Sequence, residues 1–170
     1  MGSSPASLMM FKPQKSADKI ENYRLMVEAA KAFAEDETDL IALLANLSAL
    51  IKFYVDDLNW AGFYLLKGKE LVVGPFQGLP ACTRIPEGKG VCGKAAADGK
   101  PVIVRDVHEF PGHIACDAAS ESELVIPFFK DGLVHGVLDL DSPIKGRFTD
   151  LEAEYLGKIA GILSNFLDSI

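Results

Sequence analysis

Apolar residues that recur every three or four positions predict helices at both ends of the chain. The spacing holds from Ile20 to Phe33 and again from Leu40 to Tyr54, with polar residues on the opposite side of each helix. A further stripe runs from Leu151 to Phe166, near the C-terminus. Thr149 is placed to cap this last helix, and Glu152, three residues further on, completes a capping box.

Shorter apolar runs bounded by turn residues predict strands in the middle of the chain. Residues 61–66 and 70–74 are separated by a glycine-containing turn, which predicts a hairpin. The segment ELVIPFFKDGLVHGVLDLDSP predicts a second hairpin, because its Asp131-Gly132 dipeptide readily adopts the positive φ angles of a tight turn. The glycine- and proline-rich segment between the hairpins contains a predicted short helix over residues 91–97 and a strand over residues 102–104.

Strands joined by hairpins pair antiparallel, so the chain is predicted to be an α+β protein with an antiparallel sheet. We expect the helices of the two chain ends to pack together on one face of this sheet. The active-site loops are expected on the other face, over residues 80–90 and 109–120. A chain of 170 residues, 49% of them hydrophobic, is typical of one globular domain with a proper core.

The charge of the chain narrows the classes of partner. A net charge of -7, with no run of Lys or Arg, argues against a nucleic-acid-binding surface, because such surfaces are basic. No apolar stretch is long enough to cross a bilayer, and the first residues lack the pattern of a signal peptide. We therefore expect no membrane partner and a cytoplasmic location.

The chain contains three cysteines, Cys82, Cys92 and Cys116. An odd number without a secretory signal favours free thiols over a structural disulfide framework. Metal ligation and redox chemistry both remain open. No two of the cysteines form the close C-x-x-C pair of common zinc sites, but a Cys3His site that uses His108, His113 or His135 stays an alternative.

Three acidic residues are expected to meet on the second hairpin. Asp139 and Asp141 are two positions apart on one strand, so their side chains leave the same face of the sheet. Glu123 lies on the partner strand and is able to approach them across the ladder. Clustered carboxylates raise one another's pKa, which leaves a neutral acid able to donate a proton. The alternative is a solvated strand edge without a special function.

The aromatic residues and the thiols suggest what surrounds these acids. Trp60, at the start of the first strand, offers a flat apolar wall with a polar edge and is predicted to face a pocket. Cys82 and Cys116 both fall in loops, which can move and close a disulfide. Cys92 lies between two glycines at the start of the predicted short helix, which is less mobile than a loop. A purely structural role, as a small buried side chain, therefore remains an alternative for Cys92.

Four segments carry a resemblance to a known family. NWAGFYLL, GPFQGLPACTRIPEGKGVCG, PVIVRDVHEFPGHIACDAASESELVIP and GVLDLDSP resemble the signature segments of free methionine-(R)-sulfoxide reductases, enzymes built on a GAF domain. The resemblance covers about residues 20–168. It implies a single GAF-like reductase domain over residues 16–170. The composition of residues 1–15 predicts a flexible N-terminal extension before it.

The resemblance also implies an activity and a role for each thiol. The enzyme would reduce free L-methionine-(R)-sulfoxide to methionine, with thioredoxin as reductant, no metal and no organic cofactor. Cys116 matches the nucleophile, which becomes a sulfenic acid, and Cys82 matches the thiol that resolves it to a disulfide. Cys92 matches a third cysteine of the catalytic set, so Cys82 and Cys92 both remain candidates for the resolving step. A homodimer is expected by the same analogy.

The remaining matches concern substrate binding. Glu123, Asp139 and Asp141 match the acids around the sulfoxide oxygen, and Trp60 matches the aromatic residue beside the methyl group. A non-enzymatic GAF-type sensor of a small ligand is the competing class, since it shares the fold but does not need three thiols. A cysteine-rich metal-binding module is the third class.

Overall fold

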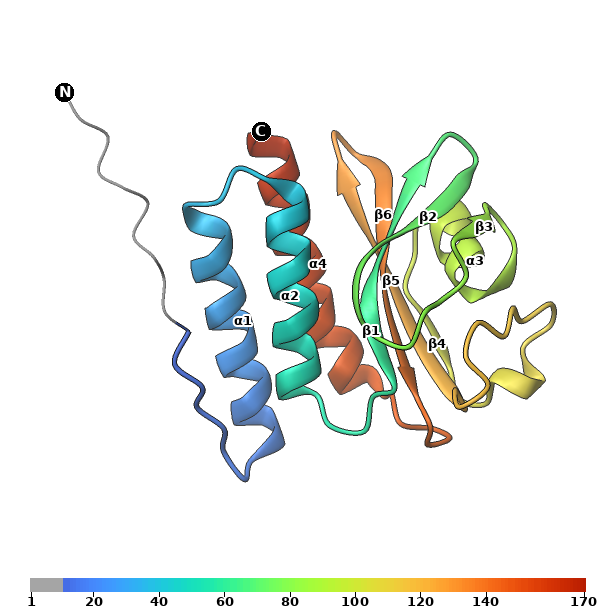
Figure 1. Cartoon of the computed structure of the whole chain (residues 1–170), viewed down its shortest axis with the longest axis horizontal. Coiled ribbons are helices and arrows are strands. Elements are labelled where there is room, and N and C mark those ends of the chain that lie inside the picture. Colours follow the sequence, from blue (N-terminus) through green and yellow to red (C-terminus); the bar gives the residue numbers. More distant parts are fainter. Residues whose placement is uncertain (1–10) are drawn as a thin grey trace.

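The computed structural model describes residues 11–170, in which a six-stranded antiparallel sheet separates a layer of helices from a layer of loops (Figure 1). The elements follow in the order α1 (Lys19–Glu35), α2 (Leu40–Tyr54), β1 (Trp60–Lys67), β2 (Glu70–Gly78), β3 (Arg84–Pro86), α3 (Gly90–Asp98), β4 (Val102–Val104), the 3-10 turn η1 (Val107–Glu109), β5 (Ser122–Lys130), β6 (Leu133–Ser142) and α4 (Asp150–Ser169).

The strands lie in the order β3-β2-β1-β6-β5-β4, and every neighbouring pair is antiparallel. The two long hairpins, β1-β2 and β5-β6, are joined side by side through β1 and β6. The second hairpin turns at Asp131 and Gly132, whose φ angles are 51° and 76°. Both residues therefore have the positive φ that the sequence predicts for this turn.

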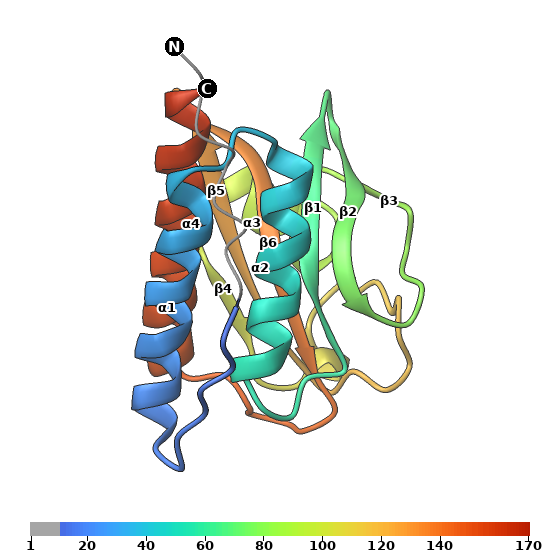
Figure 2. The ribbon, with the colours of Figure 1, turned by 60° about the vertical axis from the view of Figure 1, so that its left-hand side comes forward.

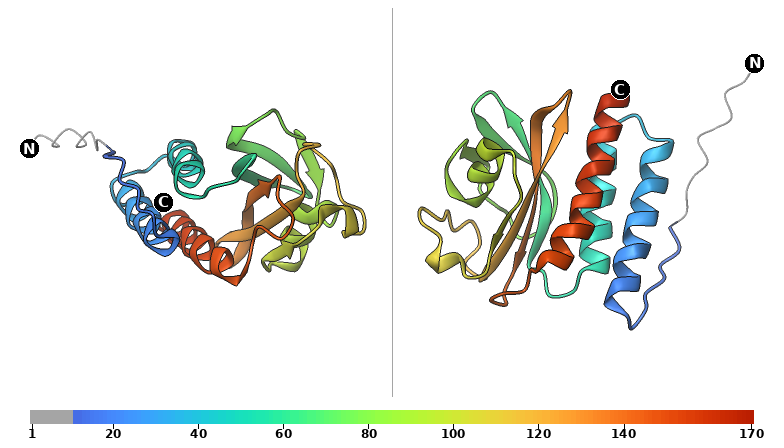
Figure 3. Two further views of the ribbon diagram at one scale, coloured as in Figure 1. Left: turned by 90° about the horizontal axis from the view of Figure 1, so that it is seen from below. Right: turned by 180° about the vertical axis from the view of Figure 1, so that it is seen from behind.

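Helices cover one face of the sheet. α2 and α4 pack directly on the strands, and α1 packs on α2 and α4 as an outer helix (Figures 2 and 3). Phe63, Leu138 and Leu140 point from β1 and β6 into this layer and are fully buried there. The predicted arrangement, with helices from both chain ends on one face and loops on the other, is confirmed.

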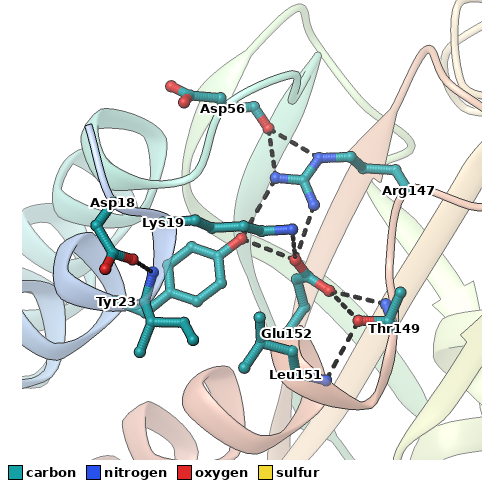
Figure 4. A network of polar contacts seen from close by, with 9 residues as sticks. Asp18, Lys19, Tyr23, Asp56, Arg147, Thr149, Leu151 and Glu152 are labelled. Carbon is teal, nitrogen blue, oxygen red and sulfur yellow. Dashed lines mark hydrogen bonds and ion pairs between the residues drawn. The ribbon is translucent and has the colours of Figure 1, made fainter. Parts of the chain in front are cut away.

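A buried ion-pair network fixes the start of α4 to the rest of the helical layer (Figure 4). Glu152 is fully buried and accepts hydrogen bonds from Tyr23 Oη at 2.9 Å and Arg147 Nη1 at 2.9 Å, while Lys19 Nζ lies 2.6 Å from the same carboxylate. Its other oxygen accepts from the backbone N–H and hydroxyl of Thr149. The predicted capping box is therefore present, and it is also part of a tertiary contact.

Several predicted boundaries need correction. Strand β2 continues to Gly78 rather than ending at residue 74, because its pairing with β1 extends to the partners Trp60 and Gly78. The sequence did not predict β3 or η1, since three residues carry too little periodicity to be recognised. The apolar stripe predicted from Leu151 to Phe166 extends one residue further, to Leu167, which is buried.

Of the N-terminal extension predicted over residues 1–15, residues 1–10 lie outside the described part of the chain. Residues 11–15 make contacts with the helical layer. Phe11 packs edge-on against Phe53, with ring centroids 5.8 Å apart, and Lys15 Nζ lies 2.7 Å from Asp56 Oδ1. The boundary at residue 15 stays a prediction. Among residues 11–170, no helix is both long enough and apolar enough to span a bilayer.

Candidate active site

The sheet register places three acidic side chains side by side under the loop layer. On β6, Leu138 and Leu140 face the helices, so Asp139 and Asp141 face the opposite side. Glu123 on β5 pairs directly with Asp141. The prediction that these acids share one face is confirmed, and the alternative of a solvated edge is wrong for Glu123 and Asp139, which are 6% and 5% exposed.

Burial makes these acids hold their protons. The pKa of Glu123 is raised to about 8, first by burial and then by the charge of Asp141. The pKa values of Asp139 and Asp141 are also raised well above their usual range, again by burial and then by the neighbouring carboxylate. At neutral pH the cluster is therefore a proton donor facing a cavity.

Two of the three thiols form a disulfide at the mouth of the cavity. Cys82 lies between β2 and β3, Cys116 lies between η1 and β5, and the two are bonded with their Cα atoms 5.3 Å apart. Tyr64 Oη on β1 donates a hydrogen bond to the Cys82 carbonyl oxygen at 3.1 Å, which attaches this loop to the sheet. The structure thus joins the two loop cysteines that the sequence singled out for their mobility.

The third thiol lies deeper. Cys92 is near the start of α3, 3% exposed, and its Sγ donates to Glu123 Oε1 at 3.7 Å. Helix α3 packs closely against the end of β3 because residue 93 is glycine. A Cβ at this position would lie 2.5 Å from the Pro86 carbonyl oxygen. Burial, then Asp139, raises the pKa of the Cys92 thiol well above its usual value, so this thiol is protonated rather than a nucleophile.

Trp60 forms the apolar wall of the cavity, as predicted. Its indole stacks on Tyr64 and Phe76, with ring centroids 5.7 and 5.1 Å apart. Within residues 11–170, neither Trp60 Nε1 nor Asp139 Oδ1 has a hydrogen-bond partner, although both atoms are buried. Buried polar groups are normally paired, so these two atoms are available to a ligand in the cavity.

The cavity is small in this disulfide-bonded form. About 30 Å³ is open to the centres of water-sized molecules, which is room for about two waters. The lining comes from both sheet and loops: Trp60, Tyr64, Ala81, Ile85, Gly90, Val91, Cys92, His113, Ile114, Cys116, Asp117, Ser120, Glu123, Asp139 and Asp141. A drug-sized ligand needs a pocket of about 300 Å³ or more, so a bound amino acid requires the loops to move outward.

The loop that carries Cys116 is attached to the sheet at its far end. Asn59, just before β1, donates from Nδ2 to Asp117 Oδ2 at 2.9 Å and to Ser120 Oγ at 3.0 Å. At the near end, His113 Nε2 lies 3.6 Å from Glu123 Oε2, and its side chain is 15% exposed. Burial lowers the pKa of His113, so its imidazole is neutral at pH 7.

The Cys3His zinc site considered from the sequence is not formed, because Cys82 and Cys116 are bonded to each other. In the described part of the chain, two groups bring three potential ligand atoms within 4.8 Å of one another: Cys92 with Glu123 and Asp139, and Asp106 with His108 and Glu121. The first is held together by the Cys92 hydrogen bond, and in the second Lys145 Nζ already lies 2.8 Å from Asp106. Neither arrangement requires an ion.

Sequence reasoning missed some of the lining. Tyr64 is four residues after Trp60 on the same strand face, so strand periodicity was a usable signal for it. His113 was considered only as a zinc ligand. Asn59, Asp117 and Ser120 are brought together by loop conformation, for which the sequence carries no periodic signal.

Comparison with known proteins gives consistent results. The family model of the GAF domain matches residues 37–168. A Bacillus subtilis protein, Protein YtsP, is 53% identical over 161 residues, covering 93% of this chain and 99% of its own. The free methionine-R-sulfoxide reductase of Escherichia coli is 48% identical over 150 residues, covering 88% of this chain and 91% of its own.

A solved structure extends the likeness to three dimensions. The free methionine-R-sulfoxide reductase from Neisseria meningitidis, in complex with its substrate, superimposes with a TM-score of 0.90 at 45% identity, over 94% of this chain and 97% of that one.

Proposed function

This chain belongs to the GAF domain family, closely related to its free methionine-R-sulfoxide reductases, and we propose that it reduces free L-methionine-(R)-sulfoxide to L-methionine. One observation carries the proposal: a disulfide between Cys82 and Cys116 closes a cavity whose floor is the protonated cluster of Glu123, Asp139 and Asp141. A redox-active thiol and a proton donor are the two groups that sulfoxide reduction needs.

The first half-reaction consumes one thiol. The Cys116 thiolate attacks the sulfoxide sulfur, and a neutral acid of the cluster, Glu123 first, protonates the sulfoxide oxygen. The S–O bond breaks, methionine leaves as the thioether, and the oxygen ends on Cys116 as a sulfenic acid. Sulfur of the substrate is reduced by two electrons, and Cys116 is oxidised by two.

The second half-reaction restores the thiol. Cys82 attacks the sulfenic sulfur, water leaves, and the Cys82–Cys116 disulfide forms. The distance between the two Cα atoms, 5.3 Å, supports Cys82 as the resolving thiol. Cys92 is buried beside Glu123 and acts as a hydrogen-bond donor to that acid rather than as the first resolving group.

The closed cavity accounts for selection of the free amino acid. A residue within a peptide carries chain on both sides, and a cavity sealed by two loops has no exit for it. Trp60 packs beside the methyl group of the substrate, a neutral acid of the cluster donates a hydrogen bond to the sulfoxide oxygen, and an acidic side chain binds the ammonium group. The loop backbone supplies N–H donors for the carboxylate.

External thiols complete the cycle. A dithiol protein such as thioredoxin would attack the half-buried Cys82–Cys116 bond and return both cysteines to thiols. A reducing compartment such as the cytoplasm suits this chemistry. A homodimer belongs to the same proposal, by analogy with the family.

The test is a coupled assay with thioredoxin, thioredoxin reductase and NADPH. We offer the free R epimer, the free S epimer and the N-acetylated R epimer separately. NADPH consumption with the free R epimer alone is the expected result. Consumption with none of them, in the presence of an active thioredoxin control, would overturn the proposal and leave a GAF-type ligand sensor as the function to test.

A further inference from the structure

The cavity contains a basic group that the reaction above does not use. Formation of the Cys116 thiolate requires a base, and an acidic environment makes that step harder because it raises the pKa of a thiol. Within the described residues, the cavity lining includes no Lys or Arg, and His113 is its one basic side chain. The imidazole of His113 is therefore placed in the same cavity as the thiol that must lose its proton.

The position of His113 connects the nucleophile with the acid. It lies three residues before Cys116 on the same loop, and both residues line the cavity. Its Nε2 lies 3.6 Å from Glu123 Oε2, and the side chain is largely buried. Other titratable groups facing the same space are Cys92 from α3, Tyr64 from β1, Asp139 and Asp141 from β6, and Asp117 from the same loop.

We propose that His113 is the base that takes the proton of the Cys116 thiol and passes it to Glu123. This inference rests on the proposed reductase function. Glu123, which is protonated at the start, donates its proton to the sulfoxide oxygen. The Cys116 proton moves from Sγ to His113, and the imidazolium returns it to the carboxylate that Glu123 has become. One thiol and one sulfoxide become one sulfenic acid and one thioether, with no net proton taken from the medium.

The structure also provides a matched control. His108 Nε2 lies 3.3 Å from Glu121 Oε2, so it forms the same type of pair five residues earlier in the chain. In this second pair His108 is exposed and Glu121 is half-buried, and neither residue lines the cavity. A general effect of removing a histidine-glutamate contact would appear in both variants, whereas an effect on proton transfer would appear in one.

The experiment is a single turnover by the pre-reduced protein without external reductant, with release of methionine followed against time. We expect His113→Gln to release methionine about 100-fold more slowly than wild type, and His108→Gln to match wild type. The wild-type rate should fall as the pH drops through the pKa of His113, and the His113→Gln rate should not show this dependence.

Chemical rescue separates proton transfer from a structural role. Imidazole added to His113→Ala should restore methionine release and leave the wild-type rate unchanged. Reduction of the oxidised variants by dithiothreitol should proceed at the wild-type rate, which shows that the disulfide loops are intact. A wild-type rate in His113→Gln, or a slow variant that imidazole does not rescue, would overturn the proposal. Failure of wild type to release methionine would instead reject the reductase function.

Discussion

Two buried glutamates show how strongly position controls the chemistry of a residue. The basic side chain beside Glu123 is His113, which is neutral, and burial followed by the charge of Asp141 raises the pKa of Glu123 to about 8. Glu152 is equally buried, and burial alone would raise its pKa, but hydrogen bonds from Lys19 and Thr149 hold it well below the usual range. The carboxyl group of Glu123 is therefore protonated and able to donate a proton, whereas that of Glu152 is an ionised group with a structural role.

The cysteine roles lead to a prediction at this scale. Cys116→Ser should lose methionine release completely, because a hydroxyl is not a sufficient nucleophile for the sulfoxide sulfur. Cys82→Ser should release about one equivalent of methionine and then stop, since the sulfenic acid on Cys116 lacks its partner. Methionine per protein chain, counted without reductant, measures both. Thioredoxin-linked turnover by Cys116→Ser would contradict the assignment.

Glu123→Gln tests the neutral acid. Glutamine keeps the shape of the side chain but has no proton to give, so methionine release should fall by about 100-fold. The rate of wild type should decline as the pH rises through about 8, where Glu123 loses its proton.

The same variant has a predicted effect on stability. The folded-state pKa of Glu123 lies above the ordinary glutamate value of 4.5, so its stabilising contribution is present below 4.5 and is lost as the pH rises through about 8. Glu123→Gln should therefore gain stability relative to wild type between pH 5 and pH 9. Urea midpoints at these two pH values measure the difference, and equal differences at both would contradict the buried, protonated state.

At the scale of elements, the strands fix the acids and the loops supply the thiols. Residues on β1, β5 and β6 are held by backbone pairing, which places Trp60, Asp141 and Glu123 in one row across three strands. Cys82 and Cys116 lie in loops that are joined by their own bond and attached to the sheet by the Tyr64 and Asn59 contacts. The acid is thus rigid, while the nucleophile is able to move between substrate and resolving thiol.

The ion-pair network of Glu152, which connects α1, α4 and the loop before β1, leads to a prediction about the stability of the protein. Glu152→Gln should destabilise the protein by about 3 kcal/mol at pH 7, because it leaves the buried Arg147 without its anion. The loss should begin to shrink as the pH falls below 4.5, since the contribution of Glu152 is complete above that value and declines progressively toward its much lower folded-state pKa.

Glu154→Gln is the control on the same helix. Glu154 is 61% exposed and pairs with Lys158 at 3.7 Å, so its removal should cost less than about 1 kcal/mol. Urea unfolding of both variants at pH 7 and pH 4 measures the comparison. Similar losses in the two variants would contradict the role assigned to the buried network.

At the scale of the whole molecule, the sheet separates the main apolar core from the candidate active site. The larger apolar core lies between the sheet and the helical layer on one of its faces (Figure 3). The cavity is on the other face, lined by residues of the sheet, of the loops and of the start of α3. The loops can therefore open without disturbing the main core. This separation matters because a cavity that accepts about two waters must enlarge before it accepts an amino acid.

Hydrogen exchange tests this opening. Reduction of the Cys82–Cys116 bond should increase amide exchange in residues 79–83 and 109–121, because these loops then lose their mutual attachment. Exchange in α1, α2 and α4 should stay the same in both redox states. Mass spectrometry of the oxidised and reduced protein measures this, and unchanged exchange in the two loops would show that substrate enters by another route.

The sequence by itself determined the helices, the two hairpins and the shared face of Asp139 and Asp141, because periodicity is a local property of the chain. It also carried the resemblance that pointed to the thiols. The tertiary structure decided that Cys82 meets Cys116, that Cys92 donates to Glu123 and that His113 contacts the same acid. These contacts join residues distant in sequence through loop conformation and burial, which no local pattern records.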